Sequence, residues 1–126
     1  PLPTDVCVPI SRLADCLAET AVDVENFGLI APIVGHVGDG NFHVQPLVDL
    51  NAPHEVEALR RFSARLVSRA ISMDGTCTGE HGVGQEKARY LPEELGEPAI
   101  DLMRRIKAAL DPAGIMNPGK MLVPLE

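Results

Sequence analysis

Apolar positions recur every three or four residues in two long stretches of the chain, the pattern of amphipathic helices. The first predicted helix covers residues 11–26, with Ser11 as its N-cap and an end at Gly28. The second covers residues 53–73, where Pro53 suits a first helical turn. The residues expected to face inward are Leu13, Leu17, Ala21 and Val24 in the first helix, and Val56, Leu59, Phe62, Leu66 and Ala70 in the second.

Shorter apolar stretches predict three β-strands, at residues 5–10, 31–37 and 42–50. The last two flank Asp39-Gly40, and Asp-Gly between such stretches is a strong hairpin signal.

The C-terminal third is predicted to be helical, after a glycine-rich segment at residues 75–84. A short helix runs to about Arg89, and a second covers residues 98–110, with Leu102, Ile106 and Ala109 facing inward. The order β-α-β-β-α-α predicts an α+β fold, with helices packed on one face of an antiparallel sheet.

Composition narrows the classes of partner. The 126 residues carry 11 Lys and Arg against 18 Asp and Glu, a net charge of −7, with one Tyr and no Trp. This balance argues against nucleic acid, which requires clustered basic and stacking side chains. No apolar run predicts a transmembrane segment or a signal peptide. Residues 1–5 look like the middle of a longer polypeptide, although a short natural gene would look the same.

Three cysteines, Cys7, Cys16 and Cys77, form no CxxC pair, and an odd number favours free thiols in a reducing compartment. We therefore expect a cytoplasmic protein, whose full-length form could lie at the surface of the inner membrane.

The predicted hairpin brings two histidines together. If Asp39-Gly40 is a two-residue turn, His36 lies directly opposite His43, about 5 Å away, on a face that also carries Gln45. Two imidazoles at that spacing suit zinc or manganese. Paired histidines are weak evidence of a metal, so a solvent-facing pair without a ligand is the commoner alternative.

The glycine-rich segment supplies one carboxylate and one further imidazole, Glu80 and His81. Because neighbours in an extended segment point opposite ways, we expect Glu80 to be a third metal ligand and His81 to be free to move a proton. The alternative is a solvated surface loop. Cys77 is expected to be a small buried thiol rather than a nucleophile.

Several segments resemble the C-terminal domain family of the FAD-linked oxidases, and within it the D-lactate dehydrogenases of the cytochrome type. They are residues 34–43 (VGHVGDGNFH), 75–84 (GTCTGEHGVG) and 110–120 (LDPAGIMNPGK), and residues 4–13 fit as well. The resemblance implies a ferredoxin-like substrate and metal domain, present in part as residues 1–126, with the N-terminal FAD-binding domain absent.

The resemblance also implies site roles. The metal ligands correspond to His36, His43 and Glu80, the catalytic base to His81, a substrate-binding position to Gln45, and a flavin-facing position to Asn117. A purely structural role for the turn at Asn117 is an equal alternative.

The implied reaction is oxidation of a small 2-hydroxyacid such as D-lactate, glycolate or D-2-hydroxyglutarate. Hydride would pass from C2 to FAD with help from a divalent metal, zinc or manganese, and electrons would then reach an external acceptor. Two alternatives remain: a small metal-dependent hydrolase, and a domain that does no chemistry by itself. An apolar surface left without the flavin domain makes a homodimer unsurprising.

Overall fold

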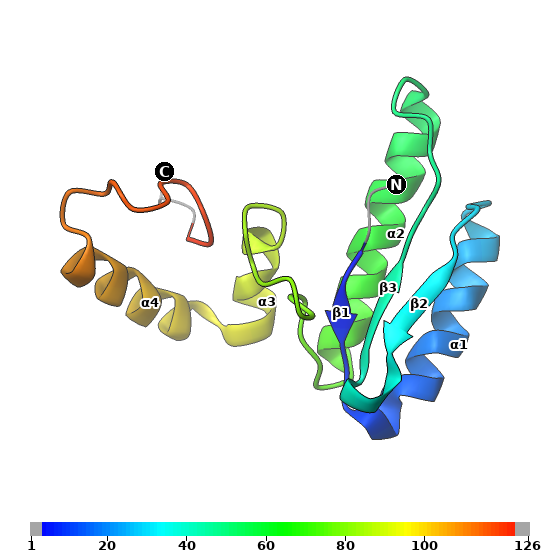
Figure 1. The fold of residues 1–126 in the computed structure, drawn as a ribbon, viewed down its shortest axis with the longest axis horizontal. Helices are drawn as coiled ribbons and strands as arrows, with labels where there is room; N and C mark the ends of the chain where they lie inside the picture. Colours follow the sequence, from blue (N-terminus) through cyan, green and yellow to red (C-terminus); the bar gives the residue numbers. More distant parts are fainter. Residues whose placement is uncertain (1–3, 123–126) are drawn as a thin grey trace. The chain divides into compact units, whose positions relative to one another are not determined.

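The computed structural model describes residues 4–122, which divide into two compact units, residues 4–81 (unit 1) and residues 82–122 (unit 2). The helices and strands of unit 1 are β1 (Val6–Cys7), α1 (Ile10–Asn26), β2 (Ile33–His36), the 3-10 turn η1 (Val37–Asp39), β3 (Asn41–Val44) and α2 (Pro53–Ser72) (Figure 1). Unit 2 contains the 3-10 turn η2 (Ala88–Tyr90), α3 (Leu91–Leu95) and α4 (Glu97–Leu110).

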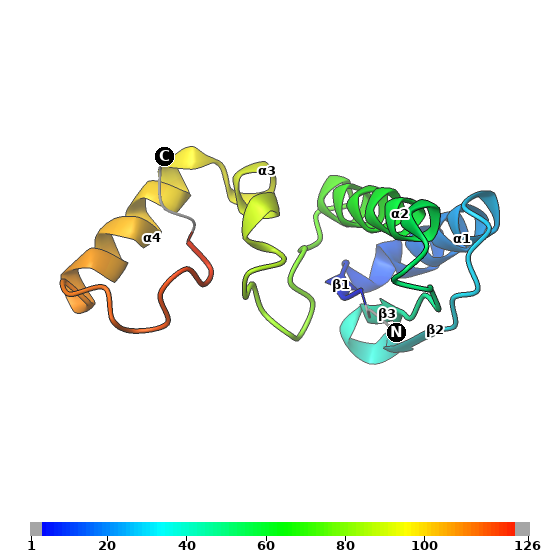
Figure 2. The same ribbon diagram turned by 90° about the horizontal axis from the view of Figure 1, so that it is seen from above.

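Unit 1 is built on an antiparallel sheet in the order β1-β3-β2. After α2 the chain returns beside β1, where Thr76 forms an antiparallel bridge with Cys7. The bridge places a rudimentary fourth strand outside β1, so the unit follows the β-α-β-β-α-β pattern of ferredoxin-like folds. Both long helices lie on one side of the sheet (Figure 2). The predicted α+β fold class is therefore confirmed.

The two faces of the sheet differ in chemistry, because successive side chains of a strand alternate. Phe42 and Val44 of β3 are 2% and 0% exposed and belong to the apolar core, together with Phe62 and Leu66 of α2. The residue between them, His43, therefore lies on the opposite face, which we call the open face of the sheet. The helices bury one face of β3 and leave the other available for a site.

The hairpin differs from its predicted register. His36 pairs with Asn41, and Val34 pairs with His43, so the loop is four residues long rather than two. It consists of η1 followed by Gly40 at φ 72°, where a Cβ atom would lie 2.0 Å from the Val8 carbonyl oxygen. Four-residue loops built on a helical turn are a common alternative to Asp-Gly turns. Because the register moves by two positions, each side chain keeps its predicted face.

The ends of the three longer predicted helices hold to within one residue. The short helix predicted to run to about Arg89 was wrong, because the helical segment begins there, with η2 at Ala88, and continues through α3 to Leu95. The inward face of α1 was predicted only in part: Leu13 is buried and Leu17 and Val24 are half-buried, whereas Ala21 is exposed and the other buried residues are Cys16, Thr20 and Asp23. In α4, Leu102, Ile106 and Ala109 are exposed and only Ile100 is buried. Periodicity identified the apolar stripe of α4, but within the described part of unit 2 the helix packs through another side. No helix formed by residues 4–122 is long and apolar enough to cross a membrane.

Candidate functional site

Four predicted site residues converge on the open face of the sheet in unit 1. His36 ends β2, His43 lies in β3, and Glu80 and His81 belong to the turn that follows α2. The Oε1 atom of Glu80 is the common centre: it lies 3.2 Å from Nε2 of His43, 3.4 Å from Nε2 of His36 and 3.7 Å from Nε2 of His81. Three imidazole nitrogens thus point at one carboxylate oxygen.

The geometry of His36, His43 and Glu80 fits a divalent metal. Donor atoms about 2.1 Å from a tetrahedral ion lie about 3.4 Å from one another. The two His–Glu80 distances match that value, and the three donor atoms all lie within 4.8 Å of one another. Imidazole and carboxylate donors suit zinc and manganese. The side chain of His43 is 11% exposed while those of His36 and Glu80 are 61% and 47% exposed, so one side of the centre is open to a small molecule.

The turn that carries Glu80 and His81 is not extended. Gly79 and Gly82 adopt φ angles of 49° and 78°, in the left-handed region that glycine tolerates best. The expectation that Glu80 and His81 point apart was therefore wrong. Instead, the His81 ring stacks on His43 with centroids 5.3 Å apart and 23° between the planes.

Sequence reasoning missed Asp5. It precedes β1, in register with His43, since Val6 pairs with Phe42. Its buried carboxylate lies 3.4 Å from Nδ1 of His43 and accepts a 2.8 Å hydrogen bond from the backbone N–H of His81. The side-chain amide of Asn41 donates a further 2.7 Å hydrogen bond to it. No local feature of residues 4–8 marks it, because its place beside His43 depends on the pairing of β1 with β3.

The remaining two predicted site residues are Gln45, which lies outside this cluster in unit 1, and Asn117 in unit 2. Gln45 is half-buried just beyond β3, and its backbone N–H donates a 2.9 Å hydrogen bond to the Pro32 carbonyl. Asn117 belongs to unit 2, where it is exposed in a turn with a φ angle of 47°.

The surroundings of Cys77 and Cys7 do not favour a nucleophilic thiolate. Cys77 is fully buried, which confirms its prediction as a buried thiol. The Cys7 thiol donates a 3.2 Å hydrogen bond to the Asp39 carbonyl oxygen. Burial, followed by the negative charges of Asp5 and Asp39, raises the pKa of the Cys7 thiol. A raised pKa keeps the thiol protonated, and the thiolate is the nucleophile.

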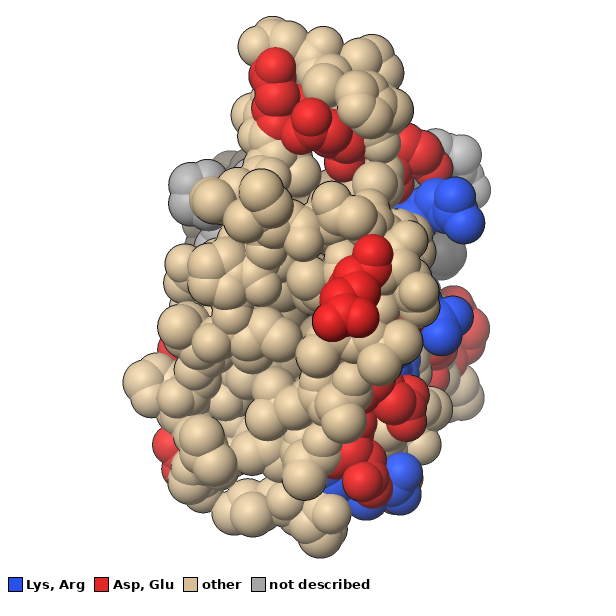
Figure 3. Space-filling model, turned by 90° about the vertical axis from the view of Figure 1, so that its right-hand side faces the viewer, with Lys and Arg blue, Asp and Glu red and all other residues tan. Residues whose placement is uncertain are grey.

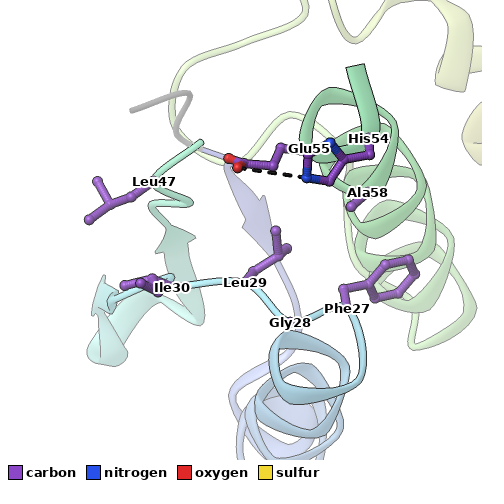
Figure 4. Close-up of a pocket in the computed structure, with 8 residues that line it drawn as sticks. All are labelled: Phe27, Gly28, Leu29, Ile30, Leu47, His54, Glu55 and Ala58. Carbon is purple, nitrogen blue, oxygen red and sulfur yellow. Dashed lines mark ion pairs between the residues drawn. The ribbon is translucent and has the colours of Figure 1, made fainter. Parts of the chain in front are cut away.

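A pocket of unit 1 lies away from the histidine cluster, near the end of α1 and the start of α2. It has a volume of about 270 Å³, and Figure 4 shows its lining residues: Phe27, Gly28, Leu29, Ile30, Leu47, His54, Glu55 and Ala58. Its two ionisable side chains pair with each other, since Nε2 of His54 is 3.9 Å from Glu55. None of the predicted site residues lines this pocket.

The surface on the β2 and α1 side of unit 1 is largely uncharged (Figure 3). Val34, the strand partner of His43, is 48% exposed, and Ile30 is 72% exposed. The edge of the sheet beside the histidine cluster therefore presents apolar side chains.

Several curated proteins are similar to nearly the whole chain. It is 53% identical over 119 residues to the probable mitochondrial D-lactate dehydrogenase of Danio rerio, which covers 94% of the chain and 24% of that relative. It is 51% identical over 118 residues to mitochondrial D-lactate dehydrogenase [cytochrome] 1 of Saccharomyces cerevisiae, covering 94% of the chain and 20% of the relative. Identity to the D-2-hydroxyglutarate dehydrogenase of Escherichia coli is 36% over 124 residues, 98% of the chain and 12% of the relative. The chain thus spans about a quarter or less of these relatives.

These names contradict the expected cytoplasmic location, with or without contact with the inner membrane. Relatives from fish, plant and yeast at 46–53% identity are mitochondrial enzymes. The prediction failed because free cysteines indicate a reducing environment and do not distinguish one reducing compartment from another.

A family model agrees with the resemblance seen in the sequence motifs. The model of FAD-linked oxidases, C-terminal domain, matches residues 1–121, which include the strands, both long helices and the whole histidine cluster. The chain belongs to the C-terminal domain family of the FAD-linked oxidases.

Proposed function

We propose that the chain is the substrate- and metal-binding part of an FAD-dependent dehydrogenase of D-2-hydroxyacids, of the D-lactate type. The observation that carries the proposal is the convergence of His36, His43 and Glu80 at donor-to-donor distances that suit a divalent metal. The substrate class comes from the relatives, which are named as dehydrogenases of D-lactate and D-2-hydroxyglutarate. The family supplies FAD as the cofactor.

Each residue of the cluster has a distinct task in this proposal. His36, His43 and Glu80 hold the metal, and His81 accepts the proton of the substrate hydroxyl group at Nε2, which lies on the same side as the other donors. When bound, the metal supplies a Lewis acid for that hydroxyl group, and FAD supplies the acceptor of the hydride from C2. The product would be the 2-oxoacid, and the two electrons would leave through an external acceptor.

Two further residues contribute to binding in this proposal. Gln45, which directly follows β3, binds the substrate. Asn117 faces the flavin. FAD is held mainly by an N-terminal domain outside these residues, so we expect the 126-residue chain alone neither to retain FAD nor to oxidise D-lactate.

Calorimetry with zinc and with manganese tests the metal site in the 126-residue chain. We expect saturable binding that disappears in His43→Ala. His54→Ala is the matched control, because the His54 side chain is 84% exposed and lines the pocket near the end of α1 and the start of α2. An unchanged isotherm in His43→Ala would contradict the assignment of the metal ligands.

Flavin reduction in the complete flavoprotein tests the division of roles. Glu80→Gln should lower metal content and activity together. His81→Ala should retain metal but slow flavin reduction by about 10²–10⁴-fold, the usual effect of losing a general base. If His81→Ala released the metal, the roles of Glu80 and His81 would have to be reassigned.

A further inference from the structure

The two ring nitrogens of His43 face different partners. Nε2 lies 3.2 Å from Oε1 of Glu80, at the centre of the cluster. Nδ1 lies 3.4 Å from Oδ1 of Asp5. Nδ1 is buried and makes no hydrogen bond within the part of the chain that the structure describes. A slightly shorter distance between the His43 ring and the Asp5 carboxylate would give Nδ1 a hydrogen bond.

A neutral imidazole carries one proton, and its position decides what the ring can do. A histidine can bind a metal through Nε2 only when that nitrogen offers its lone pair, which places the proton on Nδ1. A carboxylate beside Nδ1 stabilises this tautomer and fixes the orientation of the ring. The Asp5 side chain is 3% exposed, so its negative charge is poorly screened by water.

The same carboxylate also holds the turn that carries Glu80 and His81. Oδ2 of Asp5 accepts the backbone N–H of His81 at 2.8 Å and lies 3.7 Å from Nδ1 of that ring. Gly79 packs so closely that a Cβ atom there would lie 1.8 Å from Oδ1 of Asp5. Asp5 therefore contacts the two segments that bring the candidate metal ligands and the candidate base together.

Asp5 is poorly suited to bind a metal itself, although Asp5, His43 and His81 also bring donor atoms within 4.8 Å of one another. Its two oxygens already accept hydrogen bonds, Oδ1 from Asn41 and Oδ2 from the His81 backbone. It is buried, whereas the cluster around Glu80 is open to a small molecule.

We propose that Asp5 is the positioning residue of the site: it holds His43 in the Nδ1–H tautomer, with Nε2 aimed at Glu80, and fixes the turn at His81. The expected effect on metal affinity rests on the proposed metal site. The effect on the His43 tautomer rests on the contact between Asp5 and His43 alone. Asp5 touches neither metal nor substrate.

Nitrogen-15 NMR of the histidine rings at mildly alkaline pH reads the tautomer directly. Without a metal, the Glu80 carboxylate, 3.2 Å from Nε2, competes with Asp5 for the His43 proton, so the measurement uses the Glu80→Ala chain. We expect His43 to carry its proton on Nδ1 in Glu80→Ala. When Asp5→Asn is added, the new amide can donate to Nδ1, so the proton should move to Nε2. In Asp5→Asn with Glu80 intact, zinc affinity should fall about 10–100-fold, the usual effect of losing a carboxylate behind a metal-binding histidine.

Asp39→Asn is the matched control, because it removes one negative charge from the neighbouring hairpin loop. It should leave the His43 tautomer and the zinc affinity unchanged. Circular dichroism and thermal melting establish that each variant is folded.

The outcomes separate this proposal from the metal site. A Glu80→Ala chain with His43 protonated on Nε2 would overturn the role of Asp5, even if Asp5→Asn failed to fold. Unchanged zinc affinity in a folded Asp5→Asn variant would overturn it as well. A wild-type chain that bound no zinc would remove the metal site, while the tautomers of the Glu80→Ala chains with and without Asp5→Asn would still decide whether Asp5 sets the state of His43.

Discussion

Two carboxylates are buried among the described residues of unit 1, and they lie in different surroundings. Asp23 of α1 is sandwiched between the long helices, with a side chain 5% exposed, and Asp5 lies on the open face of the sheet with a side chain 3% exposed. Arg69 and Arg65 of α2 both donate hydrogen bonds to Asp23. The described partners of Asp5 include two histidines and an asparagine.

The difference lies in what the partners can do next. A guanidinium group stays charged and has no lone pair to offer, so the Asp23 cluster is complete once its ion pairs form. An imidazole that turns one nitrogen toward a carboxylate still has a second nitrogen for a metal or a proton. A buried charge alone does not therefore indicate a candidate functional site; the chemistry of its partners does.

The largest expected effect is the loss of stability when Asp23 is removed. Asp23→Ala leaves the Arg69 guanidinium buried, with a side chain 6% exposed and only Glu19 as a charged partner. Removing one member of such a pair costs about 3–5 kcal/mol in the free energy of unfolding. Arg65→Ala should cost less than about 1 kcal/mol, since the Arg65 side chain is 62% exposed. Urea denaturation measures both, and equal losses would contradict a closed, structural cluster.

The next largest loss of stability tests how closely the turn that carries Glu80 and His81 packs against Asp5. Gly79→Ala combines an unfavourable positive φ angle with a direct clash against Asp5, and should cost about 2–4 kcal/mol. Gly82 also has a positive φ angle, but nothing lies within 4 Å of its Cβ position. Gly82→Ala should therefore cost only about 1–2 kcal/mol. Equal costs would show that the turn is not held against Asp5.

Acid unfolding sharpens the comparison on the Asp23 side. Burial raises the pKa of Asp23, but hydrogen bonds from Arg69 and Arg65 outweigh it and hold the pKa below the ordinary 3.8. Because the folded pKa is the lower one, the stabilisation from Asp23 is complete above the unfolded value and is lost as pH falls through the folded value. Urea midpoints measured at decreasing pH should fall less steeply in Asp23→Asn than in wild type. Parallel curves would contradict this linkage.

The convergence of the four candidate residues was predictable because their residue types are informative and strand geometry tolerates small errors in register. His36 and His43 keep their shared face under a register shift of two residues, since strand side chains repeat every two positions. The glycines around Glu80 marked a turn, although not how tightly it turns.

Other features were not predictable, because they depend on contacts between distant parts of the chain. The pairing of β1 with β3 places Asp5 opposite His43, and nothing local at residue 5 signals it. The buried face of α1 includes Asp23 because Arg69, 46 residues later, neutralises it. A hydrophobicity pattern treats such an aspartate as a surface residue.

The smallest expected effect is a change in the alkylation rate of Cys7, which lies near Asp5. Cys16, near the Asp23 cluster, provides the comparison. Burial raises the pKa of both Cys7 and Cys16; the nearby charge of Asp5 raises that of Cys7 further, whereas Arg69 partly offsets the rise at Cys16. Cys7 alone among the three thiols is partly exposed, so it should dominate alkylation of the folded chain. Since the thiolate is the reactive form, Asp5→Asn should speed alkylation of Cys7 on the order of a few-fold at mildly alkaline pH. Mass spectrometry of iodoacetamide-treated chains measures the rate at each cysteine, and Asp23→Asn should leave the rate at Cys7 unchanged. An equal alkylation rate of Cys7 in Asp5→Asn and in wild type would show that the charge of Asp5 does not raise the pKa of the thiol. The electrostatic difference between the surroundings of Asp5 and those of Asp23 would then be smaller than the geometry indicates.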